Sequence, residues 1–94
     1  MIILSLNSGS SSLKYQLNDY DSGKLISSGL VDRLGEPLSS LVYQYGDETL
    51  ELKEHFNDHG NAIERVFGLF TDETYGVISS LDSIKAVGHR VVHG

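Results

Sequence analysis

The chain contains no cysteine, only one proline and no long apolar run, and these features limit the classes of protein to which it can belong. Without cysteine there is neither a disulfide scaffold nor a thiolate metal site, which fits a cytoplasmic protein. No stretch of about 18 apolar residues is present, so we expect no membrane span. The chain also begins without the basic and apolar regions of a secretory signal peptide. Its 94 residues are 39% hydrophobic and 21% charged, which is typical of one globular domain or a part of one.

Positive charge is scarce as well, since the chain has 7 Lys and Arg residues but 13 Asp and Glu residues, for a net charge of −6. This balance argues against nucleic acid or an anionic membrane as a partner. All the acids lie within residues 19–82, whereas the acid-free ends carry Lys14, Lys85 and Arg90. If the two ends meet, they form a locally positive site for an anionic substrate. The alternative is that two buried strands simply exclude charge, and the two interpretations are compatible.

The most informative motif is NSGSSSLK at residues 7–14, which lies between two strand-like segments. Such a turn is dense in backbone N–H groups and hydroxyls, and it therefore suits the phosphates of a nucleotide. The amide oxygen of Asn7 suits Mg²⁺ or ligand orientation, and Lys14 adds a positive charge. The motif is not a Walker loop, because the Gly-Lys-[Ser/Thr] ending and a following helix are both missing. The alternative is a serine-rich hairpin turn without a ligand.

A second motif, AVGHRVVHG at residues 86–94, places Arg90 in a strand between two glycines. Glycines beside a long side chain leave room for a planar, bidentate contact with a carboxylate or phosphate. The alternative is an arginine that pairs with an acid at a sheet edge. His89 and His93 would lie about 13 Å apart on a strand, too far to share a metal.

The pattern of apolar residues predicts an α/β fold with a mixed sheet, formed by a β-meander, a hairpin and a final strand over about 84–92. The predicted strands are residues 2–6, 13–17, 25–31, 41–45 and 49–52. One main helix is expected over about 58–72, with Asp58 as its N-cap. His55 and His59 flank its start, and we expect them to be surface or capping residues. Because the chain stops on an apolar strand and Gly94, we expect it to be a piece of a longer protein.

Together the two motifs resemble the two signatures of the acetate kinase family, in the same order and at a fitting distance. Residues 29–33 and 75–78 match as well, so the resemblance covers the whole chain. It implies a ribonuclease H-like fold of the actin, hexokinase and Hsp70 type. Residues 1–94 would then be a single unit, the N-terminal portion of the first domain of a two-domain kinase, with the second domain absent.

The resemblance also implies reversible phosphoryl transfer between ATP and acetate, giving ADP and acetyl phosphate with Mg²⁺. Asn7 would serve the metal, whereas Lys14, Ser10 and Ser12 would bind ATP. Arg90 would bind the carboxylate or the acyl phosphate. The catalytic Asp, His and Arg are expected beyond Gly94, so the 94-residue chain alone should be inactive. The full-length protein is expected to be a cytoplasmic homodimer.

Three alternatives remain open from the sequence. A propionate or butyrate kinase belongs to the same class, and the sequence does not give the length of the acid. A non-catalytic module would bind a nucleotide or phosphate at the serine turn and act through a partner chain. A small structural β-rich domain would bind nothing at that turn.

Overall fold

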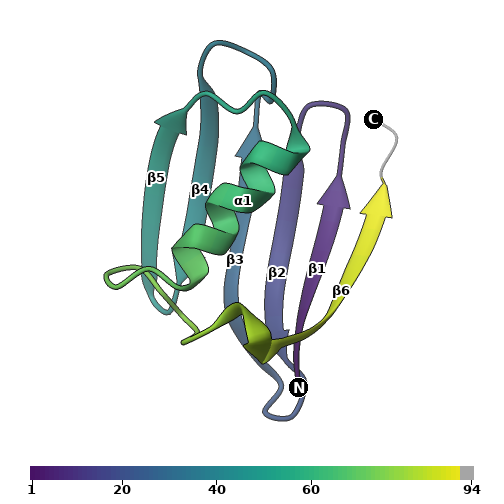
Figure 1. The fold of residues 1–94 in the computed structure, drawn as a ribbon, viewed down its shortest axis with the longest axis vertical. Coiled ribbons are helices and arrows are strands. Elements are labelled where there is room, and N and C mark those ends of the chain that lie inside the picture. The colour runs from purple at the N-terminus through teal and green to yellow at the C-terminus, as the bar shows by residue number, and fades with distance from the viewer. Residues whose placement is uncertain (92–94) are drawn as a thin grey trace.

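The computed structural model describes residues 1–91, which form one six-stranded sheet with a helix on one face (Figure 1). Residues 92–94, where the predicted last strand was to end, lie outside the described part. The elements are β1 (Ile2–Ser8), β2 (Leu13–Asp19), β3 (Lys24–Asp32), β4 (Ser39–Tyr45), β5 (Glu48–Glu54), α1 (His59–Phe70), a single 3-10 turn η1 (Leu81–Ser83) and β6 (Ile84–Val91).

The strands are ordered β5-β4-β3-β2-β1-β6 across the sheet. Consecutive strands from β1 to β5 pair antiparallel, whereas β6 returns alongside β1 in parallel. The sequence-based prediction of a mixed sheet built from a meander, a hairpin and a final strand is therefore confirmed. The first five strands are longer than predicted, because polar residues at their ends still pair in the ladder. Asn7 and Ser8, for example, belong to β1, so the serine turn is reduced to residues 9–12.

Helix α1 begins as predicted and ends two residues early. The Asp58 side chain caps it by accepting a hydrogen bond from the Asn61 amide at 2.9 Å. Beyond Phe70, the Asp72 carboxylate accepts from the amides of Thr74 and Tyr75 at 2.8 and 3.0 Å, which turns the chain out of the helix. The backbone donors of Tyr75 and Thr74 hold the pKa of Asp72 below its ordinary value.

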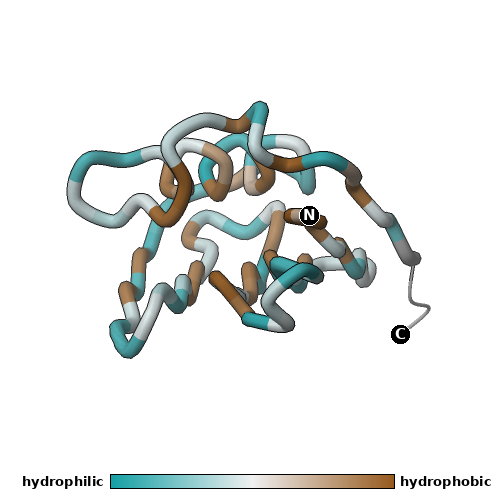
Figure 2. The backbone as a smooth tube through the Cα atoms, turned by 90° about the horizontal axis from the view of Figure 1, so that it is seen from below, coloured by the Kyte–Doolittle hydropathy of each residue, from teal (hydrophilic) through white to brown (hydrophobic). Residues whose placement is uncertain are grey.

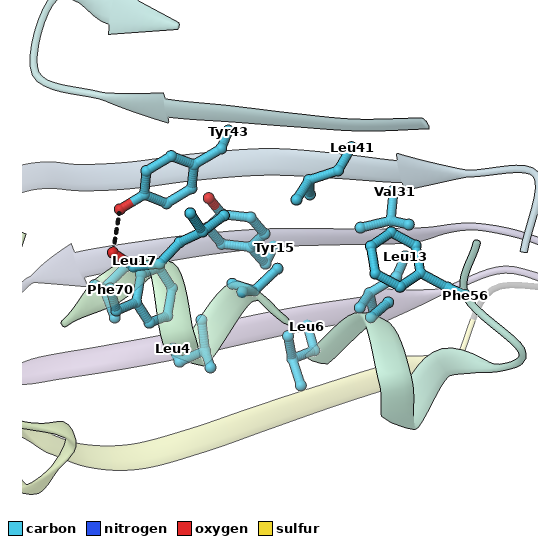
Figure 3. Packing of buried hydrophobic residues seen from close by; sticks show 13 residues of the cluster. Leu4, Leu6, Leu13, Tyr15, Leu17, Val31, Leu41, Tyr43, Phe56 and Phe70 are labelled. Atoms are coloured by element: carbon cyan, nitrogen blue, oxygen red, sulfur yellow. Dashed lines mark hydrogen bonds between the residues drawn. The ribbon is translucent and has the colours of Figure 1, made fainter. Parts of the chain in front are cut away.

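The core lies between α1 and one face of the sheet (Figure 3). Alternate strand residues face the helix because side chains alternate across a strand. The Tyr15 ring meets Phe70 edge-on at 5.5 Å, and the Tyr43 hydroxyl donates to the Leu69 and Tyr75 carbonyls at 3.3 and 2.8 Å. The buried apolar residues are Leu4, Leu6, Leu13, Tyr15, Leu17, Val31, Leu41, Tyr43, Phe56, Ala62, Val66, Leu69 and Phe70.

No element within residues 1–91 covers the opposite face of the sheet, which we call the open face (Figure 2). Lys14 and Gln16 of β2 point to this face and are exposed, whereas their neighbours Leu13, Tyr15 and Leu17 are buried against the helix side. Among the described residues, no helix is both long and apolar enough to cross a membrane.

Gly29 leaves room for the ring of Tyr15, and its replacement tests how this ring packs. The two residues are paired across β2 and β3, and a Cβ on Gly29 would lie 2.5 Å from the Val42 carbonyl oxygen and also clash with the Tyr15 ring. We expect Gly29→Ala to lower the free energy of unfolding by about 1–3 kcal/mol in urea denaturation. Gly68→Ala is the matched control, because a Cβ there meets nothing within 4 Å and helix propensity predicts a gain. Equal stability of wild type and Gly29→Ala would contradict this packing.

The buried phenol of Tyr43 makes the free energy of unfolding vary with pH in the alkaline range. Burial raises its pKa from the ordinary 10.0 to about 12. Between these values the unfolded chain loses the Tyr43 proton while the folded chain keeps it, so the free energy of unfolding falls as pH rises. Its contribution is complete below pH 10. We expect urea denaturation of Tyr43→Phe to show a shallower loss of stability over this range, and an unchanged slope would exclude the effect. Tyr20→Phe, at an exposed phenol, is the control.

Candidate functional site

The serine turn, residues 9–12 between β1 and β2, lies at the carboxyl end of β1. The carboxyl end of the parallel strand β6 reaches the same edge of the sheet, and α1 begins beside it (Figure 1). The Ser8 hydroxyl and His89 Nε2 lie 2.9 Å apart and link β1 to β6 next to the turn. In open sheets with parallel strands, ligands bind outside the carboxyl ends of the strands. The serine turn therefore occupies the edge where a ligand is expected.

The serine turn contains an internal hydrogen bond, and its carbonyl groups are contacted by donors from other parts of the chain. The Gly9 amide donates to the Ser12 carbonyl at 2.9 Å. Nε2 of His59, the first residue of α1, lies 2.8 Å from the Gly9 carbonyl oxygen and 3.1 Å from that of Ser12. The Leu34 amide donates to the Ser11 carbonyl at 2.9 Å. Three carbonyl oxygens of the turn thus face protein donors, which is compatible with an anion bound by N–H groups of the turn.

Strand register brings three of the predicted site residues together. Asn7 of β1 lies opposite Lys14 of β2 on one side and opposite the backbone of Arg90 of β6 on the other. Paired residues share a face, so the side chains of Asn7 and Lys14 both lie on the open face. Asn7 is half-buried and Lys14 is exposed. The condition stated for the two acid-free ends is met, because β6 pairs with β1 along the length of β1.

A hollow of about 380 Å³ opens next to this row, lined by Ser5, Leu6, Asn7, Gly88 and His89. Gly88 lies opposite Ser5, and a Cβ there would meet nothing within 4 Å. Gly88 therefore leaves open space two residues before Arg90, whereas Gly94, the other glycine of the prediction, lies outside the described residues. Its position between the acid-free strands makes the hollow suited to an anionic group.

The sequence-based interpretation missed one residue of this site. His59 was expected to be a surface or capping residue, but Asp58 is the cap, and the His59 ring is half-buried against the serine turn. His55 binds the Glu36 carbonyl and the Asn57 side chain instead, away from the turn. The contact of His59 joins residues about 50 positions apart, so no local pattern in the sequence could reveal it.

Comparison with solved structures defines the class of fold. The chain superimposes on the crystal structure of Porphyromonas gingivalis acetate kinase with a TM-score of 0.90 and 39% identity, covering 99% of this chain and 24% of that one. A propionate kinase from Francisella tularensis gives a TM-score of 0.80 and 26% identity, with 99% and 23% covered. The six-stranded sheet and its helix thus match the corresponding quarter of acetate kinase.

Sequence comparison establishes the family. A model of the acetokinase family matches residues 2–94, and the chain belongs to that family. Curated relatives include the acetate kinases of Finegoldia magna and Clostridium novyi, each 48% identical over 94 residues. This chain is covered completely, but it spans only 24% and 23% of these relatives. The chain therefore corresponds to about a quarter of an acetate kinase.

Gly9 provides a test of whether the serine turn binds phosphate. A Cβ at this position would lie 2.7 Å from the Ser12 hydroxyl oxygen, and that hydroxyl would have to rotate away. We expect Gly9→Ala to change the free energy of unfolding by less than about 1 kcal/mol. In a titration with inorganic phosphate followed by NMR, the amides of residues 9–12 should shift in the wild type and respond more weakly in the variant.

The β4–β5 turn at Gly46 is the internal control of this titration, because it lies in another hairpin and its amides should not shift. Amides of residues 9–12 that do not respond to phosphate in the wild type would favour a structural turn without a ligand.

Proposed function

We propose that this chain is the N-terminal portion of the first domain of a two-domain acetate kinase, which transfers a phosphoryl group reversibly between ATP and acetate. The observation that carries the proposal is the register of β2, β1 and β6. It aligns Lys14, Asn7 and the Arg90 backbone next to the serine turn, in a member of the acetokinase family. Phosphoryl transfer requires mainly positioning and neutralisation of charge, and these residue types provide both.

The two substrates are assigned to different parts of the site. Lys14 and the serine turn, with Ser10 and Ser12, bind the phosphates of ATP. Arg90 binds the carboxylate of acetate, or the acyl phosphate in the reverse reaction, because a guanidinium matches either group with two parallel hydrogen bonds. The register supports this division, since Lys14 and Arg90 flank Asn7 from opposite sides.

Mg²⁺ is assigned to Asn7. The amide is half-buried beside the hollow and supplies one uncharged oxygen. Mg²⁺ usually keeps several waters and takes its other ligands from substrate phosphates, so one or two protein oxygens are enough. Within residues 1–91 no group of three acidic or histidine side chains could hold a metal alone, and this fits an ion shared with ATP. When bound, the metal neutralises phosphate charge.

The remaining catalytic groups belong to the part of the protein that the chain does not span. The catalytic Asp, His and Arg are assigned to sequence beyond Gly94, in line with relatives about four times as long. The 94-residue chain alone is therefore inactive, and the full-length protein acts as a homodimer in the cytoplasm. Formation of acetyl phosphate by purified residues 1–94 would contradict this division.

Propionate is the second candidate acid, because a solved propionate kinase has the same fold in this region. Acetate is favoured by the higher identity to acetate kinases, at 48% and 39%. The ratio of kcat/KM for acetate and propionate in the full-length enzyme decides between them.

Arg90 and Asn7 are expected to affect different substrates of the full-length enzyme. Arg90→Ala should raise KM for acetate and lower kcat, with a loss of about 2–5 kcal/mol in transition-state stabilisation, because it leaves a desolvated carboxylate unpaired. Asn7→Ala should instead shift the Mg²⁺ dependence of the rate. Steady-state kinetics with each substrate and the metal varied in turn measures both effects.

Arg65→Ala is the matched control, since Arg65 pairs with Glu54 at 3.0 Å on the partly exposed side of α1. Its kinetic constants should equal those of the wild type. An unchanged kcat/KM for acetate in Arg90→Ala would show that Arg90 does not bind the substrate. An unchanged Mg²⁺ dependence of the rate in Asn7→Ala would show that Asn7 does not bind the metal.

A further inference from the structure

The contact between His59 and the serine turn points to a role that neither the family nor the motifs assign. We propose that His59 is a positioning residue, which holds the turn in the shape that binds the phosphates of ATP without touching the substrate. The proposal rests on the proposed function of the turn, and it adds a residue from outside both sequence motifs. Its basis is the pair of contacts from Nε2 to the Gly9 and Ser12 carbonyls, at 2.8 and 3.1 Å.

The chemistry of these contacts determines which ring nitrogen carries hydrogen. A carbonyl oxygen can only accept a hydrogen bond, so Nε2 of His59 must be protonated and shares its hydrogen between the two oxygens. Gly9 and Ser12 are the first and last residues of the turn, and the Gly9 amide also donates to the Ser12 carbonyl. His59 therefore joins the two ends of the turn and keeps the carbonyl oxygens of Gly9 and Ser12 directed toward α1.

This orientation matters because of the sign of the ligand. A carbonyl oxygen is the negative end of the peptide dipole and repels a phosphate, whereas the N–H end attracts it. Holding the carbonyls of Gly9 and Ser12 on the helix side presents the positive side of the turn to the ligand. A turn that is already in this shape does not have to reorganise when ATP binds.

His59 can position the turn because it is itself held in place. Asp58 caps α1 through the Asn61 amide, and the Asn61 side chain accepts from the Asn57 amide at 3.2 Å. One turn further along α1, Ala62 is fully buried against the sheet. The ring thus extends from the rigid first turn of a packed helix, as is required of a residue that orients a binding group.

A backbone contact supports the middle of the turn but cannot be removed by a side-chain change. Arg33 adopts a φ of 60°, which is uncommon for a residue with a side chain, and the next amide, of Leu34, donates to the Ser11 carbonyl. His59 is therefore the side chain whose replacement tests how the turn is held.

The kinetic test uses the full-length protein with His59→Ala and His59→Gln, and His55→Ala as the matched control. Loss of one shared hydrogen bond should raise KM for Mg-ATP roughly three- to tenfold, while KM for acetate and the melting temperature stay near those of the wild type. Glutamine keeps an N–H donor at a similar position, so His59→Gln should recover part of the loss. An unchanged KM for Mg-ATP in His59→Ala, or equal increases for both substrates, would overturn the proposal.

A second measurement separates this inference from the proposed function. Hydrogen–deuterium exchange of residues 7–13 in the full-length protein should be faster in His59→Ala than in the wild type, because His59 no longer holds the Ser12 carbonyl that accepts from the Gly9 amide. His55→Ala should leave this exchange unchanged, since His55 binds elsewhere. Faster exchange in a protein without kinase activity would support the role of His59 and refute the proposed reaction. Unchanged exchange in His59→Ala would refute the role of His59 whatever the activity.

Discussion

The parallel pairing of β1 with β6 is the interaction on which the rest of the structure depends. It places residues from the start of the chain beside residues more than 80 positions later, with Asn7 opposite Arg90. Parallel strands cannot be joined by a tight turn, so the intervening chain must cross over the sheet. Here it forms the four-strand meander and hairpin and then α1, which covers one face (Figure 1). The pairing also brings the two acid-free segments together and thus determines where an anion is favoured.

The two faces of the sheet contribute differently to the candidate site. On the helix side, the buried core ends at the first turn of α1, where His59 holds the serine turn by its carbonyls. On the open face, Asn7 lines the hollow at Gly88, and Lys14 lies opposite Asn7 on β2. The helix side therefore contacts the turn through its carbonyl oxygens, and the open face carries the side chains that we propose for metal and phosphate. In this proposal, packing and ligand binding use opposite sides of the same four-residue turn.

Much of this arrangement could be predicted from the sequence, because local periodicity reports directly on which residues are buried. The alternation of Leu13, Tyr15 and Leu17 identified β2, and Asp58 marked the start of α1. Two features lay outside these predictions. The Asp72 carboxylate accepts from the amides of Thr74 and Tyr75 and turns the chain out of α1 two residues before the predicted end. Gly29 packs closely against Tyr15 across β2 and β3. Neither His59 nor Gly29 has a local signature of its role.

The sequence by itself determined the family, the strand and helix content, and the two motifs that carry Asn7, Lys14 and Arg90. These features depend only on which residues occur along the chain and at what spacing, so the sequence is enough to identify them. Only the tertiary structure decided that Asn7 lies between Lys14 and the Arg90 backbone, and that His59 closes the serine turn. Strand register and helix docking depend on how the whole core packs, and a contact made through that packing leaves no periodic trace in the sequence.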